Sequence, residues 1–254
     1  MRSFFFLCSL VCGVYAFGAA PPEQIPREYW NEFTWNGTIP VTPYYLNDTC
    51  DTDKPTFYKA ETINKLIEKA NRREVNYYGK TDIYLYGALS KFPIAGKEVG
   101  IIGSAVPWYE AVVLSFKGKP TTIEYNKIVT DHPDLKVMTV EEYATSHKTF
   151  DVLLSISSLE HDGLGRYGDP INPNGDILWM ERAPKMLKKN GMLILSVPVG
   201  QDRLFWNAHR QYGKLRLPRI FKGWELVDTF GFSPADLTIY EHAGHQPIFV
   251  LIPE

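Results

Sequence analysis

The stretch EVGIIGSAVPWYEA, Glu98 to Ala111, decides the fold. Its apolar run, Val99–Ile102, predicts a buried strand, and a turn of small residues begins at Gly103. Pro107 follows at a position typical of a helix start, where its missing amide hydrogen costs nothing. Free amides at such a start can face a polar ligand. The stretch therefore predicts a strand, a turn that can hold a ligand, and a helix.

The same alternation of apolar strands and helices continues to the end of the chain. Further strands are expected at Thr121–Tyr125, around Val137, and at Phe150–Ile156, Met192–Val197, Leu237–Tyr240 and Ile248–Ile252. Helices are expected at Ala60–Tyr77, Pro107–Phe116, from Thr139 with its T-x-x-E cap, Ile177–Lys189 and Phe221–Phe230. This pattern predicts the α/β class, with a Rossmann-like, mostly parallel, doubly wound sheet and an antiparallel closing strand.

The composition is that of an ordinary globular protein. The chain has 254 residues, 44% of them hydrophobic, and a formal net charge of -2, which allows one good-sized core. There is no long Lys/Arg block, so nucleic acid is not expected as a partner. Outside the first residues the sequence contains a single cysteine, Cys50, which excludes an internal disulfide.

The N-terminus has the features of a secretory signal. Arg2 precedes an uncharged apolar run, Phe4–Ala20, and we expect residues 1–18 to be a signal peptide and the protein to be secreted or lumenal. An uncleaved membrane anchor is the alternative, although Gly13 and Gly18 interrupt the run. No later stretch is expected to span a membrane.

Two further segments complete the expected organisation. Residues 19–80 are predicted to form an irregular arm, packed by Trp30, Trp35 and Tyr44, followed by an amphipathic helix, and residues 81–254 to form the Rossmann domain. The arm carries two N-glycosylation sequons, at Asn36 and Asn47, which predict a glycoprotein.

The turn at Gly103 and the carboxylate of Glu124 are the first candidate ligand site. In parallel sheets, ligands bind beyond the carboxyl ends of the strands, and Glu124 ends the next strand at the spacing typical of a ribose-binding acid. However, Ala105 and Pro107 stand where a glycine fingerprint would continue, which argues against a dinucleotide site. A turn without a ligand is the alternative.

A long polar loop, Ser158–Asp176, is the second candidate. His161 has an ordinary pKa near neutrality and is a candidate general base, and Arg166 could orient an anionic group. Their polar neighbours in the loop are Glu160, Asp162, Tyr167 and Asp169. The alternative is a surface loop with a hydrogen-bonded histidine.

The segment WNAHRQYG, Trp206 to Gly213, is the third candidate. Its Asn207, His209 and Arg210 are typical of polar-ligand recognition, and we expect them to converge with His161; a lid packed by Trp206 is the alternative. Asp51–Asp53 and the pair His242 and His245 resemble metal ligands, but each is interpreted as a turn, and no metal is expected.

The element order, Glu124, FDVLLSISSLEHDG and LKKNGMLILSVPVG together resemble the core of class I S-adenosylmethionine-dependent methyltransferases. More closely, GSAVPWYE, SSLEHDGLGRYGDPINPNGD and WNAHRQYG resemble a nematode-rich family of uncharacterised proteins with that core, over about Lys97–Phe232. The resemblance implies S-adenosylmethionine as cofactor. It would lie against Gly103, Ser104 and Ala105, with Glu124 on the ribose and the segment from Ser157 facing the methyl group.

Two hypotheses follow from these residues. The first is a methyltransferase of the secretory pathway acting on a glycan or small polar metabolite. Its candidate catalytic residues are Glu160, His161, Asp162, Arg166 and His209, and its candidate substrate-binding residues are Tyr167, Asp169, Asn207 and Arg210. The second is a catalytically inactive protein of the same fold that binds such a molecule. It is favoured by Ile101, which stands where the superfamily carries an acidic residue.

Overall fold

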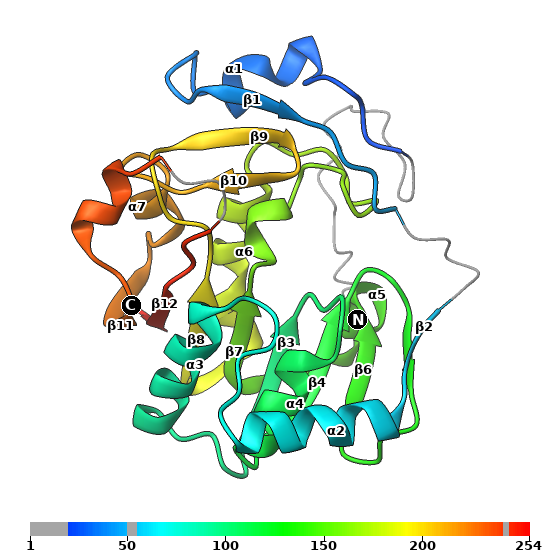
Figure 1. The fold of residues 1–254 in the computed structure, drawn as a ribbon. Helices are drawn as coiled ribbons and strands as arrows, with labels where there is room; N and C mark the ends of the chain where they lie inside the picture. The colour runs from blue at the N-terminus through cyan, green and yellow to red at the C-terminus, as the bar shows by residue number, and fades with distance from the viewer. Residues whose placement is uncertain (1–19, 50–54, 241–243) are drawn as a thin grey trace, which may run out of the picture.

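A central seven-stranded sheet forms the body of the protein in the computed structural model, which describes residues 20–49, 55–240 and 244–254. Its strand order is β11-β12-β8-β7-β3-β4-β6 (Figure 1). The strands are β3 (Glu98–Ile102), β4 (Lys119–Glu124), β6 (Lys136–Thr139), β7 (Phe150–Ile156), β8 (Leu187–Ser196), β11 (Trp224–Phe230) and β12 (Ile248–Pro253). Strand β12 pairs antiparallel with both neighbours, and the other pairings in the sheet are parallel. The expected α/β class with an antiparallel closing strand is confirmed.

The order of the strands reverses at β3. The chain continues from β3 to β4 and β6 on one side, and then returns to place β7 and β8 on the other side of β3. Ile101 on β3 is accordingly paired with Thr122 on β4 and with Leu154 on β7. Ligands of doubly wound sheets bind beyond the strand carboxyl ends at such a reversal. The fold therefore directs attention to the residues after Ile102, Glu124 and Ile156.

Two hydrophobic cores cover the two faces of the sheet. Along β7 the side chains alternate: Val152 and Leu154 pack in one core, and Leu153 packs in the other. Helices α3 (Lys80–Lys91) and α4 (Trp108–Ser115) close the first core, and α2 (Ala60–Asn71) lies across α4 (Figure 1). Helices α5 (Val140–Ser146) and α6 (Gly175–Arg182) supply side chains to the second core. The apolar runs of the sequence are thus buried on both faces.

The N-terminal arm is more regular than expected. It contains a 3-10 turn, η1 (Arg27–Tyr29), a short helix, α1 (Trp30–Phe33), and a strand, β1 (Val41–Tyr44), that pairs with β9 (Arg203–Asn207) and through it with β10 (His209–Gln211). Trp30 and Tyr44 do not anchor it, because they are 46% and 43% exposed. Instead, Phe33 packs edge-on against Trp206 with ring centroids 5.1 Å apart. The arm is therefore joined to the segment that the sequence analysis assigned to ligand recognition.

A separate two-stranded sheet joins the chain before α2 to the segment between β4 and β6. Strand β2 (Thr56–Tyr58) runs parallel to β5 (Ile128–Thr130), and Tyr58 is buried. Neither strand was predicted, because each is three residues long. Helix α3 was also not predicted, and the helix expected at Ala60–Tyr77 ends at Asn71.

Three predicted elements near the C-terminus are wrong. The helix expected to run to Lys189 ends at Arg182, because Pro184 begins a 3-10 turn, η3 (Ala183–Met186), and lacks the amide hydrogen that would continue the helix. The helix expected at Phe221–Phe230 is absent: a single turn, α7 (Leu217–Ile220), ends before it, and Trp224–Phe230 form β11, where pairing with β12 outweighs helix propensity. The strand expected at Leu237–Tyr240 is largely replaced by η4 (Pro234–Thr238), which Ser233 and Asp236 cap.

Several local predictions are confirmed, and others lie outside the described residues. The helix after Gly103 and the strand at Phe150–Ile156 are present, and Thr139 and Glu142 form the expected capping box. A 3-10 turn, η2 (Leu159–His161), follows β7. The signal at residues 1–18, Cys50, Asp51–Asp53 and His242 fall outside the described residues. Within the described part of the chain, no helix is long and apolar enough to cross a membrane.

Replacing Leu154, which is fully buried in the middle of β7, tests this account of the core. Leu154→Ala should lower the free energy of unfolding by about 2–5 kcal/mol, because it leaves a cavity between the sheet and α4. Val227→Ala on the exposed face of edge strand β11 should change it by less than about 0.5 kcal/mol. Urea denaturation of both variants measures the difference, and equal losses would contradict the assignment of the core.

Candidate functional site

A cavity of about 920 Å³ opens at the carboxyl ends of β3, β4 and β7. This volume is within the usual range for small-molecule sites. We call its two parts the β4 end, formed by Gly103, Ser104, Ala105, Glu124 and Tyr125, and the β7 end, formed by Tyr77, Tyr78, Tyr109, Ser157, His161 and Tyr167. The cavity therefore lies at the reversal of strand order, where the fold predicts a ligand.

The carboxylate of Glu124 joins the ends of β3 and β4. Its Oε2 accepts a hydrogen bond of 2.7 Å from the amide of Ser104, and its Oε1 accepts one of 2.8 Å from the amide of Tyr125. Burial raises the pKa of Glu124, and the backbone amides around it oppose that shift. The expected neighbours, the turn at Gly103 and the acid at residue 124, are thus in direct contact.

Gly103 is required by both its conformation and its surroundings. Its φ is +74°, a region that favours glycine, and an added Cβ would overlap the Ser158 side chain. The following residue is held from a second direction, since the Tyr58 hydroxyl donates to the Ser104 carbonyl at 2.9 Å. The turn is therefore fixed by three separate segments, with Ala105 and Val106 exposed at its tip.

Glu110 is a residue that the sequence analysis missed. It is fully buried on α4, where its Oε1 accepts a hydrogen bond of 2.7 Å from the Thr122 hydroxyl and its Oε2 has no hydrogen-bond partner. Burial raises its pKa, the Ser104 and Thr122 side chains oppose the shift, and the charge of Glu124 adds to it. An acid within the apolar run WYEAVVLS was the available signal. Glu110 is thus a buried acid next to the Gly103 turn, although it is not among the described residues that line the cavity.

A second buried acid, Glu160, lies beneath the β7 end. Ser157, which lines the cavity, donates a hydrogen bond of 2.6 Å from its hydroxyl to Oε1 of Glu160. Glu160 is 1% exposed, and its Oε2 has no hydrogen-bond partner. Burial raises its pKa to about 7. Glu160 can therefore gain or lose a proton near neutral pH, in contact with a hydroxyl that faces the cavity.

His161 is a neutral imidazole in this structure. Its Nδ1 is 2.6 Å from the Ala208 carbonyl, which can only accept, so Nδ1 carries the hydrogen and Nε2 carries the lone pair. Nε2 is 3.8 Å from Oε1 of Glu160. Burial, with the nearby charge of Arg166, lowers the pKa of His161 to about 3. A histidine with so low a pKa is a hydrogen-bond acceptor and a weak base, so Glu160 suits the role of proton acceptor better.

The remaining polar residues of the 158–176 loop hold the loop in place. Arg166 donates from Nε to Asp48 at 2.7 Å and from a terminal nitrogen to the Ala208 carbonyl at 3.2 Å. Asp169 accepts from the amides of Gly163 and Gly165. Burial raises the pKa of Asp162 well above its usual value, and the charge of Asp169 adds to the shift. All three aspartates and Arg166 line the cavity, but Arg166 already has partners.

Three candidates from the 206–213 segment are not among the described residues that line the cavity, and their roles in ligand recognition stay predictions. Asn207 is buried, accepts from the Leu46 amide and donates to the Leu164 carbonyl. Arg210 is buried, donates to the carbonyls of Asp162, Asn172 and Pro173, and faces Asp176. His209 stacks on Phe205 with ring centroids 4.7 Å apart. The Ala208 carbonyl of this segment accepts a hydrogen bond from His161, so the segment lies beside that residue.

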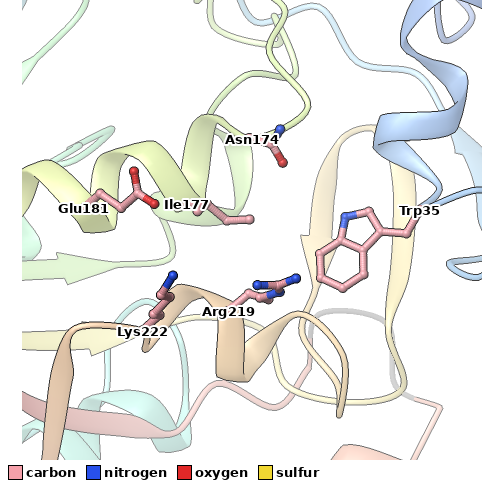
Figure 2. Close-up of a pocket in the computed structure, with 6 residues that line it drawn as sticks. All are labelled: Trp35, Asn174, Ile177, Glu181, Arg219 and Lys222. Atoms are coloured by element: carbon pink, nitrogen blue, oxygen red, sulfur yellow. The ribbon is translucent and has the colours of Figure 1, made fainter.

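A smaller recess of about 260 Å³ lies between the arm and the second face of the sheet (Figure 2). Trp35 faces Ile177 of α6 and Arg219 of α7 across it, and the rim carries Glu181 and Lys222. It shares no lining residue with the larger cavity, so we do not include it in the site. Within the described part of the chain, no cluster of three His, Cys, Asp or Glu side chains could hold a metal, and His245 contacts Asp236 instead.

The strand order and the cavity at its reversal define a methyltransferase-like Rossmann fold, of the class I type. Among solved structures, the 1,6-didemethyltoxoflavin-N1-methyltransferase of Burkholderia thailandensis, with bound 1,6-didemethyltoxoflavin and S-adenosylhomocysteine, is similar at a TM-score of 0.52. It is 13% identical, over 75% of this chain and 86% of that one. The PH0226 protein of Pyrococcus horikoshii OT3 is similar at a TM-score of 0.50 and 11% identity, over 73% of this chain and 95% of that one. At sequence identities this low, the similarity to these two structures shows a shared fold and nothing more.

The sequence itself gives the family. Residues 96–243 match the family described as Caenorhabditis protein of unknown function, DUF268, and the chain belongs to that family. No curated protein matches the sequence. The resemblance to a nematode-rich family with a methyltransferase-like core is thus confirmed.

The raised pKa of Glu160 predicts how stability depends on pH. Between the ordinary glutamate pKa of 4.5 and about 7, the native carboxyl keeps a proton that the unfolded chain loses. The native state binds more protons in this window, so stability falls as pH rises through it, by up to about 1.4 kcal/mol per pH unit.

Glu160→Gln should remove this dependence, so the variant should gain stability relative to the natural protein between pH 5 and pH 8. Urea denaturation at both pH values measures the gain, with Glu181→Gln, an exposed acid on α6, as the control. Parallel curves for the Glu160 variant and the control would show that Glu160 is ionised at pH 5.

Proposed function

We propose that this protein is an S-adenosylmethionine-dependent methyltransferase of the secretory pathway that acts on a small molecule. The supporting observation is that the Gly103 turn and the Glu124 carboxylate share the mouth of one cavity, with a hydrogen bond of 2.7 Å between Glu124 and the Ser104 amide. In dinucleotide-binding sheets an acid at this position holds ribose hydroxyls. The fold that the chain shares with a methyltransferase supports the same cofactor.

The residues at the β4 end fit an S-adenosyl group. Each carboxylate oxygen of Glu124 accepts one amide and has capacity for a further hydrogen bond, which two ribose hydroxyls would use. Ile123, Tyr125 and Val140 provide an apolar and aromatic wall for a purine base. Gly103 and Ser104 would face the sulfur end, and Ser157 would lie toward the methyl group. The bound cofactor would supply a methyl group that is open to attack by an acceptor.

The departures from the superfamily pattern bear on the amino-acid end of the cofactor. Ile101 is 2% exposed and packs in the hydrophobic core, so it offers no charge to an ammonium group. Orientation provides most of the catalysis in a simple displacement, and few polar residues are needed. The alternative proposal is a binding protein without activity, which is favoured by this loss and by the partners that Arg166 already has.

Titration of the purified protein with S-adenosylmethionine tests the cofactor. We expect micromolar binding by calorimetry, and Glu124→Ala should weaken it at least about tenfold, or 1.4 kcal/mol, because the ribose hydroxyls lose their acceptor. Glu68→Ala, at an exposed position on α2, is the control and should bind as the natural protein does. Binding that is absent from the natural protein, or equal in both variants, would contradict the proposal.

Expression in a eukaryotic secretory host tests the location. Asn36 and Asn47 are both exposed, as glycan acceptors must be. We expect Asn36→Gln and Asn47→Gln each to remove one glycan, seen as a step in gel mobility that glycosidase treatment abolishes, and mass spectrometry to find the first residues cleaved. A protein retained in the cell without glycan would contradict the secretory part of the proposal.

A further inference from the structure

We propose that the β7 end of the cavity binds a neutral aromatic hydroxyl compound, a phenol, and that Ser157 passes the hydroxyl proton to Glu160. This inference rests on the proposed function and names the acceptor class for the same site. Three features of the β7 end support it: its aromatic walls, its charge, and the geometry around Ser157.

The walls of the β7 end are aromatic. Tyr78 and Tyr109 are nearly parallel, with an interplanar angle of 5° and centroids 6.5 Å apart, and Tyr77 stands edge-on to Tyr78 at 4.6 Å. Tyr167 stands edge-on to His161 at 5.3 Å. Aromatic rings favour offset-stacked and edge-on partners. A flat aromatic acceptor would add one more ring to an arrangement that is already in place.

The charges of the β7 end disfavour an anionic acceptor. Arg166 is the cation nearest to His161 among the described lining residues, and it is bonded to Asp48 and to the Ala208 carbonyl. Asp48 also lines the cavity. Burial raises the pKa of Asp162 and disfavours its charged form, so Asp48 is the acid that matters for an anion. A carboxylate or phosphate placed beside His161 would meet the charge of Asp48, and Arg166, the cation there, already has partners. Arg182 and Lys185 line the cavity outside the β7 end.

A protonated amine is disfavoured for a different reason. The proposed cofactor carries a positive sulfonium, and a second cation placed in contact with it would be repelled. A neutral hydroxyl group is repelled neither by the acid in the cavity nor by the sulfonium of the cofactor. The charge pattern therefore selects a neutral acceptor from among the common methyl acceptors.

Ser157 is placed to receive the acceptor's hydroxyl. Its hydroxyl donates to Oε1 of Glu160 at 2.6 Å and accepts from Nε2 of Gln246 at 3.2 Å. A hydroxyl has one hydrogen and two lone pairs, and the Tyr78 side chain also contacts Ser157, so an incoming phenol O–H would take the place of the Tyr78 hydroxyl. Ser157 lines the cavity while Glu160 is buried behind it. A proton can therefore pass from the cavity to Glu160 through one residue.

The basicity of Glu160 favours a phenol over a sugar. Burial raises its pKa to about 7, which is some 3 units below the pKa of about 10 of a phenol such as tyrosine. The hydroxyl of a sugar is a much weaker acid, and proton transfer to Glu160 would be far less favourable. Proton transfer to Glu160 therefore favours a phenol over a glycan, as the aromatic walls do.

The step balances without another reactant. The acceptor oxygen forms a bond to the methyl carbon as the carbon–sulfur bond breaks, and the bonding pair stays on sulfur. The hydroxyl proton moves to Ser157 Oγ while the Ser157 proton moves to Glu160, which ends neutral. His161 keeps its proton on Nδ1 and offers Nε2 as an acceptor that can orient the ring substituents.

Direct binding tests the acceptor class without the cofactor. Ligand-observed NMR with the full chain would compare p-cresol, p-toluate and methyl glucoside, which share size or hydroxyl chemistry but differ in charge and ring. We expect p-cresol to bind at least about tenfold more tightly than p-toluate, and Tyr78→Ala to remove the difference from methyl glucoside. Equal or tighter binding of p-toluate or methyl glucoside would overturn the inference.

Turnover with S-adenosylmethionine and p-cresol tests the proton path. We expect Glu160→Gln and Ser157→Ala to lower kcat about 100-fold. In the natural protein kcat should rise with pH through about 7, and this limb should be absent in Glu160→Gln. Glu160→Asp should recover part of the rate. Glu181→Gln is the matched control and should keep both rate and pH profile.

The outcomes separate this inference from the proposed function. A variant at Glu160 that keeps the rate and the pH limb overturns the proton path, even where S-adenosylmethionine binds normally. Failure of S-adenosylmethionine to bind overturns the proposed function, while the NMR comparison still decides the acceptor class. Affinity for S-adenosylmethionine should change by less than about twofold in the Glu160 and Ser157 variants, which excludes a general loss of structure.

Discussion

The carboxylate of Glu124 is the contact on which the cavity depends. It joins the amides of Ser104 and Tyr125, and so fixes the ends of two parallel strands relative to one another. Gly103 permits this closeness, because a side chain there would meet Ser158 from the third strand end. Without that contact the loop after β3 could move away from β4, and the cavity would lose the wall that suits a nucleoside.

Buried acids behave in two opposite ways in this molecule, and the difference separates the site from the scaffold. Asp176 is buried, but Arg210 and Arg216 outweigh the effect of burial and lower its pKa to about 2. Glu110 and Glu160 are equally buried, have no cation in hydrogen-bonding contact, and each leaves one oxygen without a partner. Their pKa values rise instead. The unpaired acids lie next to the cavity, and the paired acid anchors the loops that support it.

Much of the fold was predictable from the sequence, for identifiable reasons. The apolar runs at Val99–Ile102 and Phe150–Ile156 gave their strands, because buried parallel strands need apolar residues on both faces. Errors arose where local and tertiary preferences disagree. Residues 224–230 form a strand because β12 offers a partner, and η3 ends α6 early at Pro184. The three-residue strands β2 and β5 leave too short a pattern to detect.

The sequence predicted where the candidate site lies better than it predicted the role of each side chain in it. The spacing from Gly103 to Glu124 placed both residues at one edge, and the structure brings them into contact. The sequence could not show that Arg166 is hydrogen-bonded to Asp48, or that Arg210 donates hydrogen bonds to backbone carbonyls of the loop. It also could not show that burial makes His161 a weaker base than Glu160. Those roles depend on burial and on partners far away in the chain. Glu110 was identifiable only as an acid within an apolar helix.

A crystal structure of the protein with S-adenosylhomocysteine is the most direct test of the account. The account predicts the ribose hydroxyls within hydrogen-bonding distance of Glu124, the sulfur beside Gly103 and Ser104, and an open space between the sulfur and Ser157. A ligand bound elsewhere, or a cavity that excludes it at saturating concentration, would contradict the assignment of this mouth of the sheet as a cofactor site.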